Sequence, residues 1–261
     1  MTIDFTSKGL VYGSDEAERV TVEREHAFIG EGGGPLPFEL YRPPGAGGPR
    51  PAVVFVSGYP DPGLVAMLGK PLKDWASYQQ WARLVAASGL VGVTYANREP
   101  GDVVELVRRL RADAAALGID PERIGVWACS GNVPTALGLV AREQVRAAAL
   151  LYGFMLDVDG TTEVADAAQQ FHFAPPAVTL AELPRDTPLL VVRAGRDATP
   201  GLDASLQRFL AAAQARGLPI TRIDHPEAPH AFDVVDDSPT SRRVIADVLA
   251  FLRDTLNAGV T

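Results

Sequence analysis

The chain has 261 residues, of which 47% are hydrophobic, so residues 1–261 can bury the core of a single α/β domain. Its formal net charge of −8 argues against nucleic acid or an anionic membrane as a partner. The only cysteine, Cys129, excludes an internal disulfide, and the first residues lack the basic start and apolar stretch of a secretion signal. No apolar run approaches the ~20 residues of a membrane helix, so we expect a cytoplasmic protein.

Predicted strands and helices alternate along most of the chain. Residues 21–29 and 36–42 have the pattern of two strands joined by a glycine-rich turn, which predicts a hairpin. Residues 52–56 form a continuous apolar run, which is typical of a strand buried on both faces. Further strands are predicted at 90–95, 123–128, 147–152, 189–194 and 220–224, and helices at 77–88, 102–117, 132–142, 203–216 and 239–256. This order predicts an α/β fold with a mostly parallel central sheet and helices on both faces.

Residues 153–188 interrupt this alternation. So long a stretch between two strands is typical of a functional insertion, and its aromatic side chains favour a short lid over the site. Phe171 and Phe173 lie two residues apart without clear helical periodicity, and an extended segment points such a pair to the same side. We expect both to be buried and at least one to line the substrate pocket. A surface excursion that caps one end of the core is the alternative.

The segment around Ser130 is the most informative part of the sequence. The apolar strand 123–128 runs into this serine, small residues flank it, and a helix pattern begins almost at once. Such a turn exposes the hydroxyl above the sheet and aims the free N–H groups of the helix at it. Asp197 and His230 follow later strands, and the carboxyl ends of parallel strands lie along one edge of a sheet. A serine nucleophile, a histidine base and an orienting carboxylate can therefore meet there.

The base and the acid each have rivals. Among the four histidines, His26 lies on an early strand, His172 in the insertion, and His225 at the end of the strand before His230. Asp203 is the nearest rival for the orienting carboxylate, although an aspartate at that place more readily begins the next helix.

Four motifs, in this order, resemble the α/β-hydrolase superfamily, and most of all its dienelactone hydrolase-like and small-esterase branch. They are Val53–Pro60, Asp120–Ile124 leading to the serine turn, Gly195–Asp197 and Pro229–Phe232. The resemblance covers nearly the whole chain and implies the α/β-hydrolase fold, with Ser130 as nucleophile, His230 as base and Asp197 as orienting acid. It also implies an oxyanion hole formed by the backbone N–H groups of Gly131 and Tyr59.

The serine turn departs from the family pattern two residues before and two residues after the nucleophile. Glycine is usual at both positions because a strained turn crowds a Cβ atom, but this chain has Ala128 and Asn132. Asn132 could hydrogen-bond locally or face the substrate, and we count it among the pocket residues. Cys129 is an alternative nucleophile, since relatives in this branch use cysteine, but Trp127 would then stand where there is no room for it. We therefore favour Ser130.

Together these features predict a cofactor-free serine hydrolase that cleaves a small carboxylic ester or lactone. The scattered histidines and the lone cysteine match no metal-ligand spacing. The glycines of residues 30–34 are not followed by a helix, so they do not form a dinucleotide-binding loop. Cleavage of an amide or peptide bond on the same scaffold is one alternative. A non-catalytic binding protein is another, suggested by Asn132. The sequence does not determine the oligomeric state.

Overall fold

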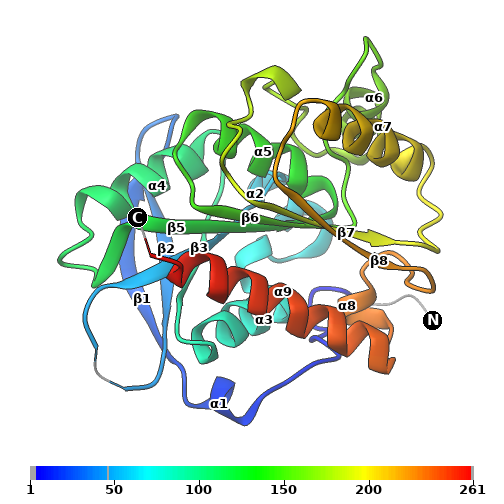
Figure 1. The fold of residues 1–261 in the computed structure, drawn as a ribbon. Coiled ribbons are helices and arrows are strands. Elements are labelled where there is room, and N and C mark those ends of the chain that lie inside the picture. Colours follow the sequence, from blue (N-terminus) through cyan, green and yellow to red (C-terminus); the bar gives the residue numbers. More distant parts are fainter. Residues whose placement is uncertain (1–3, 46, 260–261) are drawn as a thin grey trace.

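An eight-stranded sheet forms the centre of the molecule (Figure 1). The computed structural model describes residues 4–45 and 47–259, so the first three of the residues examined for a secretion signal lie outside it. Across the sheet the strand order is β1-β2-β4-β3-β5-β6-β7-β8. The strands are β1 Thr21–Ile29, β2 Pro35–Arg42, β3 Arg50–Phe55, β4 Val91–Tyr95, β5 Ile119–Cys129, β6 Ala147–Leu151, β7 Leu189–Ala194 and β8 Ile220–His225. Every strand predicted from the sequence is present.

The sheet is antiparallel only at one edge. β1 and β2 form the predicted hairpin, and β2 also pairs antiparallel with β4. The remaining neighbours, from β4 across to β8, are parallel. The central strands β3, β4 and β6 are buried almost throughout, as their apolar sequences require. The predicted mostly parallel sheet is confirmed.

Helices cover both faces of this sheet (Figure 1). One hydrophobic cluster packs α4, α5 and α7 on one face, and a second packs α3 and α9 on the other. Neighbouring strand residues alternate between the two clusters, as Val53 and Val54 do on β3. These helices are α3 Ala76–Ala87, α4 Asp102–Ala112, α5 Val133–Arg142, α7 Leu202–Ala215 and α9 Pro239–Asn257.

Several short helices were not predicted from the sequence. They are α1 Asp15–Glu18, α2 Asp61–Leu68, α6 Glu163–Phe171 and α8 Phe232–Val235, with single 3-10 turns at Leu72–Asp74, Ser130–Asn132 and Leu180–Glu182. α2 does carry sequence signals, because prolines surround its first residue and Gly69, with φ of 79°, ends it. α4 is shorter than predicted, since the chain turns after Ala112 and passes through Gly118, with φ of 57°, into β5.

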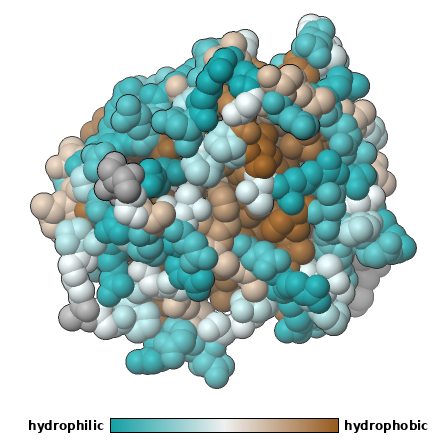
Figure 2. Space-filling view, viewed as in Figure 1, coloured by the Kyte–Doolittle hydropathy of each residue, from teal (hydrophilic) through white to brown (hydrophobic). Residues whose placement is uncertain are grey.

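The exposed apolar side chains of the molecule concentrate on α2. Val65, Met67 and Leu68 are 44%, 59% and 47% exposed. The face shown in Figure 2 is largely hydrophilic, with an apolar patch enclosed by hydrophilic residues. In the part of the chain that the structure describes, no helix combines the length and apolar character needed to cross a bilayer.

Candidate active site

Three strands bring Ser130, Asp197 and His230 to one edge of the sheet. Ser130 directly follows β5, and the other two lie in the loops after β7 and β8. Because β5, β6, β7 and β8 are parallel neighbours, their carboxyl ends share this edge. The two loops are also joined directly, since the N–H of Arg196 donates to the carbonyl oxygen of Ala228 at 2.8 Å.

Ser130 occupies a strained turn. Its φ is 53°, in the left-handed region that non-glycine residues rarely adopt. Such strain costs ~1–3 kcal/mol and persists only where the surrounding structure enforces it. The 3-10 turn Ser130–Asn132 leads straight into α5, so the N-terminal end of that helix faces the serine. The turn has the sharp strand-to-helix geometry expected from the sequence.

Ser130, His230 and Asp197 form a continuous chain of hydrogen bonds. Ser130 Oγ lies 2.9 Å from His230 Nε2, and His230 Nδ1 lies 2.5 Å from Asp197 Oδ2. The N–H of Thr199 donates to the other carboxylate oxygen at 3.0 Å. Burial acts to raise the pKa of Asp197, but the hydrogen bonds from His230 and Thr199 outweigh it and hold that pKa below its usual value. An ionised Asp197 accepts the Nδ1 proton, which leaves Nε2 free to accept the proton of Ser130.

The rival acid and bases are placed elsewhere. Asp203 forms an ion pair with Arg193. His225 is buried against a hydroxyl of α9, and His26 stacks on a phenylalanine of β2. His172 follows the last residue of α6 with φ of 62°. None of the four lines the cavity beside the serine.

Cys129 is buried and unsuited to act as the nucleophile. Burial raises the pKa of its thiol to about 12, and the sulfur lies 3.5 Å from Tyr78 Oη. A cysteine attacks as the thiolate, which is scarce at neutral pH when the pKa is this high. The geometry therefore favours Ser130 over its neighbour.

The loop after β3 packs directly on the Ser130 turn. A Cβ atom on Gly58 would lie 2.6 Å from the carbonyl oxygen of Gly131, so glycine alone permits this approach. The N–H of Gly58 donates to Asn132 Oδ1 at 2.7 Å. The N–H of the next residue, Tyr59, donates to no acceptor among residues 4–45 and 47–259. It is therefore available for the oxyanion hole that we predict it forms with the N–H of Gly131.

The amide of Asn132 is engaged within the protein. Its Nδ2 donates to Tyr78 Oη at 2.6 Å and to the carbonyl oxygen of Cys129 at 3.0 Å, while Oδ1 accepts from Gly58. The residue is only 2% exposed. Because both amide hydrogens are used, Asn132 has no donor left for a substrate. It lines the cavity, as predicted, while its amide bonds to neighbouring groups of the protein.

A cavity of about 410 Å³ opens beside Ser130 and His230. Its walls are mostly apolar and come from the N-terminal segment, α2 and the residues after it, the serine turn and α8. The lining residues are Asp4, Phe5, Thr6, Tyr59, Leu64, Met67, Leu68, Leu72, Trp75, Ser77, Tyr78, Cys129, Ser130, Asn132, Tyr152, His230, Ala231 and Val234. Much of this wall lies in residues 61–75, which hold no predicted strand, helix or site residue.

The insertion 153–188 lies beside this cavity and contributes no residue to its lining. Phe171 is the last residue of α6 and is 37% exposed, whereas Phe173 is buried and packs edge-on against Tyr59 with ring centroids 6.1 Å apart. The predicted extended segment is wrong, because α6 continues to Phe171 and His172 then reverses the chain direction locally. Neither phenylalanine lines the cavity, which corrects the predicted pocket, and Phe173 instead supports the proposed oxyanion loop.

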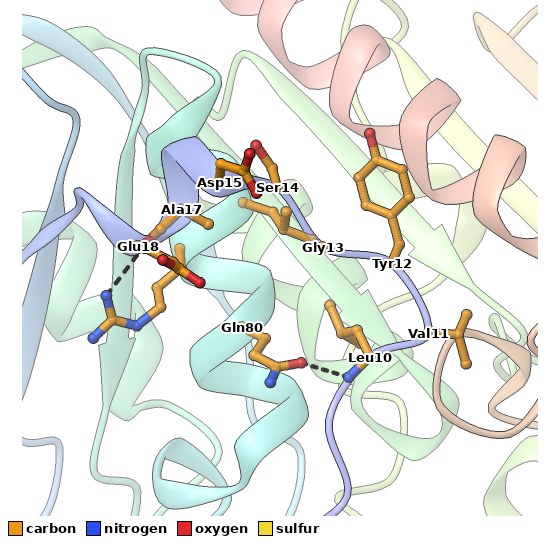
Figure 3. Close-up of a pocket in the computed structure, with 11 residues that line it drawn as sticks. Leu10, Val11, Tyr12, Gly13, Ser14, Asp15, Ala17, Glu18 and Gln80 are labelled. Atoms are coloured by element: carbon orange, nitrogen blue, oxygen red, sulfur yellow. Dashed lines mark hydrogen bonds between the residues drawn. The ribbon is translucent and has the colours of Figure 1, made fainter.

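A second cavity, of about 480 Å³, lies beneath the N-terminal segment and shares no lining residue with the first (Figure 3). In it, Gln80 accepts a hydrogen bond from the N–H of Leu10 at 2.6 Å, and Arg83 donates to the carbonyl oxygen of Ala17. Ser14 lines it too, but its hydroxyl caps α1 and no histidine lies in this wall. Over the residues that the structure describes, no group of three or more His, Cys, Asp or Glu side chains could hold a metal ion.

Solved structures of esterases resemble this chain over most of its length. A thermostable esterase from Pseudomonas putida has a TM-score of 0.72 and 17% identity, over 95% of this chain and 86% of that chain. The Pyrobaculum calidifontis esterase has a TM-score of 0.68 and 20% identity, over 91% and 87%. An α/β hydrolase enzyme from the metagenome of Lake Arreo has a TM-score of 0.69 and 18% identity, over 94% and 86%. No protein-family model and no curated protein matches the chain. The sheet order and these likenesses show that the chain has the α/β-hydrolase fold.

Proposed function

We propose that this protein is a serine hydrolase that cleaves carboxylic esters of small, uncharged molecules. The observation that carries the proposal is the hydrogen-bonded series of Ser130, His230 and Asp197 at the edge of an apolar cavity. A serine hydroxyl is a weak nucleophile until a base accepts its proton, and the 2.9 Å between Oγ and Nε2 allows that transfer. The esterases that share the fold support the same activity.

The reaction proceeds through an acyl-enzyme in this proposal. Ser130 Oγ attacks the ester carbonyl carbon as its proton passes to His230 Nε2, and Asp197 stabilises the resulting imidazolium. The carbonyl oxygen becomes an oxyanion, which accepts hydrogen bonds from the N–H groups of Gly131 and Tyr59. His230 then protonates the leaving alcohol. A water molecule then attacks the acyl carbon as its proton passes to His230. The bond between that carbon and Ser130 Oγ breaks, His230 returns the proton to Oγ, and the acid leaves.

The cavity wall favours an uncharged, apolar substrate. Leu64, Leu72 and Val234 present hydrocarbon to the cavity, and none of the described residues that line it is Lys or Arg. Asp4 is an exposed lining residue, and its carboxylate accepts hydrogen bonds from Thr6 and Ser7. A lactone that carries a carboxylate would lose hydration there without gaining a cation as partner. We therefore favour simple esters over charged lactones of the dienelactone type.

Non-catalytic binding has weaker support, and the likeness to esterases favours ester over amide cleavage. Asn132, the residue that suggested a non-catalytic protein, bonds to Gly58 and Tyr78 and leaves the Ser130–His230 hydrogen bond intact.

A series of p-nitrophenyl esters, from acetate to dodecanoate, tests the proposal alongside p-nitroanilides of the same acyl groups and a carboxylated lactone. We expect turnover of the neutral esters, little turnover of the lactone, and covalent labelling of Ser130 by a fluorophosphonate. Ser130→Ala should abolish both turnover and labelling. Comparable rates on esters and anilides would favour an amidase. A folded protein that neither turns over any ester nor reacts with the fluorophosphonate would refute the proposal.

A further inference from the structure

A buried carboxylate, Asp233, lies close to the proposed triad but outside it. It follows His230 by three residues and is 1% exposed. Its Oδ1 accepts a hydrogen bond from Tyr152 Oη at 2.7 Å, and its Oδ2 accepts one from Trp81 Nε1 at 2.8 Å. Burial raises the pKa of Asp233, and the hydrogen bonds from Trp81 and Tyr152 oppose that rise. Asp233 is thus the acceptor at the end of a buried polar network.

Asn132, Tyr78 and Cys129 form a second network of buried polar side chains. Asn132 Nδ2 donates to Tyr78 Oη at 2.6 Å, and Tyr78 Oη lies 3.5 Å from the sulfur of Cys129. The hydroxyl of Tyr78 therefore joins the amide of Asn132 to the residue before Ser130.

This second network reaches the oxyanion loop. Asn132 Oδ1 accepts from the N–H of Gly58, which directly precedes Tyr59. We call Asn132, Tyr78 and Cys129 the elbow network.

The two networks lie beside different catalytic groups. Cys129 and Asn132 belong to the turn that holds Ser130. The ring of Tyr152 packs edge-on against the ring of His230, with centroids 5.1 Å apart. The elbow network therefore joins the serine turn to the loop of the proposed oxyanion donor, whereas Asp233 and Tyr152 lie beside the proposed base.

We infer that the elbow network positions the N–H of Tyr59 for the oxyanion, with Asn132 and Tyr78 as its positioning residues. The inference rests on the proposed hydrolase function of Ser130. Both amide hydrogens of Asn132 are used within the protein, so it acts on the reaction through Gly58 and not on the substrate itself. Oxyanion donors stabilise a transition state only where they are already aimed at the developing charge.

The burial of these hydrogen bonds explains how the elbow network can hold the loop. A hydrogen bond is electrostatically stronger in a low-dielectric interior than in water, and a buried polar group without a partner is costly. Removing the hydroxyl of Tyr78 leaves Asn132 Nδ2 without one acceptor and Cys129 without one partner, both in buried surroundings. The Gly58–Asn132 hydrogen bond then loses the contact that orients its acceptor.

The variant Tyr78→Phe tests this inference, because it removes only the hydroxyl. Tyr41→Phe is the matched control: Tyr41 is buried like Tyr78, at 1% against 5% exposed, and donates to Glu39 at 3.1 Å, but it does not line the cavity. The measurements are kcat and KM for a p-nitrophenyl ester, the inhibition constant of a trifluoromethyl ketone, and the melting temperature. The ketone forms an oxyanion when Ser130 adds to its carbonyl carbon, so its affinity reports the oxyanion donors directly.

For Tyr78→Phe we expect kcat to fall about 10-fold, below the ~10²–10³ that follows removal of a whole oxyanion donor. KM should stay within about 2-fold, and the inhibition constant of the ketone should rise in proportion to the loss in kcat. Tyr41→Phe should leave kcat and ketone affinity unchanged. A residue that only stabilises the fold would lower the melting temperature and leave the ketone affinity of the folded protein unaltered.

Equal kcat and equal ketone affinity in Tyr78→Phe and Tyr41→Phe would overturn the inference. If Tyr78→Phe does not fold, Asn132→Gly decides the matter, because glycine is the usual residue at this place of the turn and removes the bridge to Gly58 without crowding. Unchanged ketone affinity in that variant would likewise overturn it.

An unmodified protein without turnover or fluorophosphonate labelling would overturn the proposed function and this inference together, whereas an active protein with unaffected variants overturns the inference alone.

Discussion

Replacing Asp197 with asparagine tests the proposed triad with little disturbance of packing. The two side chains have nearly the same shape, and that of Asp197 is 1% exposed. Asparagine Oδ1 can still accept from the N–H of Thr199, but its amide nitrogen then stands where Asp197 Oδ2 now lies, 2.5 Å from His230 Nδ1. Because that nitrogen donates, the His230 proton moves to Nε2, where it prevents acceptance of the Ser130 proton.

We expect kcat of Asp197→Asn to fall by about 10³–10⁴, which corresponds to roughly 4–5 kcal/mol of lost transition-state stabilisation. KM should change little, because Asp197 does not line the cavity. The assay is steady-state hydrolysis of a p-nitrophenyl ester, with the rate of fluorophosphonate labelling as an independent measure and the melting temperature as a check of folding.

Asp203→Asn is the control for this experiment. Asp203 pairs with Arg193 outside the cavity, so its variant should keep kcat within about 2-fold of the unmodified protein. A folded Asp197→Asn variant with more than about a tenth of the original kcat would refute the assigned role, because a wrong histidine tautomer is incompatible with such activity.

The remaining predictions concern the nucleophile, the insertion and the α2 loop. Cys129→Ser should keep fluorophosphonate labelling at Ser130, since a hydroxyl replaces the thiol in its hydrogen bonds; loss of labelling would make the cysteine the nucleophile. Phe173→Ala should lower kcat more than Phe171→Ala, because only Phe173 packs on the oxyanion loop, and equal effects on ester turnover would remove the insertion from the site. Burial raises the pKa of Asp61 to about 6. The stabilisation that protonated Asp61 gives the folded protein is therefore fully present below pH 3.8 and is lost as the pH rises through about 6. That loss is at most roughly 3 kcal/mol. Between about pH 4 and pH 7, the melting temperature of Asp61→Asn should therefore fall less than that of the unmodified protein. Identical melting profiles of the two proteins would contradict this expectation.

Much of the fold follows from local sequence patterns. The apolar run of β3 and the alternation of strands and helices predict a mostly parallel sheet, because hydrophobic periodicity reports which faces of an element are buried. The same patterns predict that Ser130, Asp197 and His230 share an edge, since each follows a parallel strand.

The sequence also contains signals for two helices, α2 and α6, that are absent from the predicted elements. α2 carries prolines at its start and a glycine at its end, and its apolar residues form one wall of the cavity. α6 also has a helical pattern, because Val164, Ala167, Ala168 and Phe171 are spaced i, i+3, i+4 and i+7, and the extended segment expected around Phe171 overlooks it.

The role of Asn132 depends on the tertiary structure alone. Its partners Gly58 and Tyr78 lie 74 and 54 residues away along the chain, and no local pattern links them. Burial periodicity and strand ends are local properties, so residue patterns alone predict the sheet, its helices and the chain order of Ser130, Asp197 and His230. The lining of the cavity and the partners of the Asn132 amide depend on contacts between segments far apart in the chain, so they follow only from the folded structure.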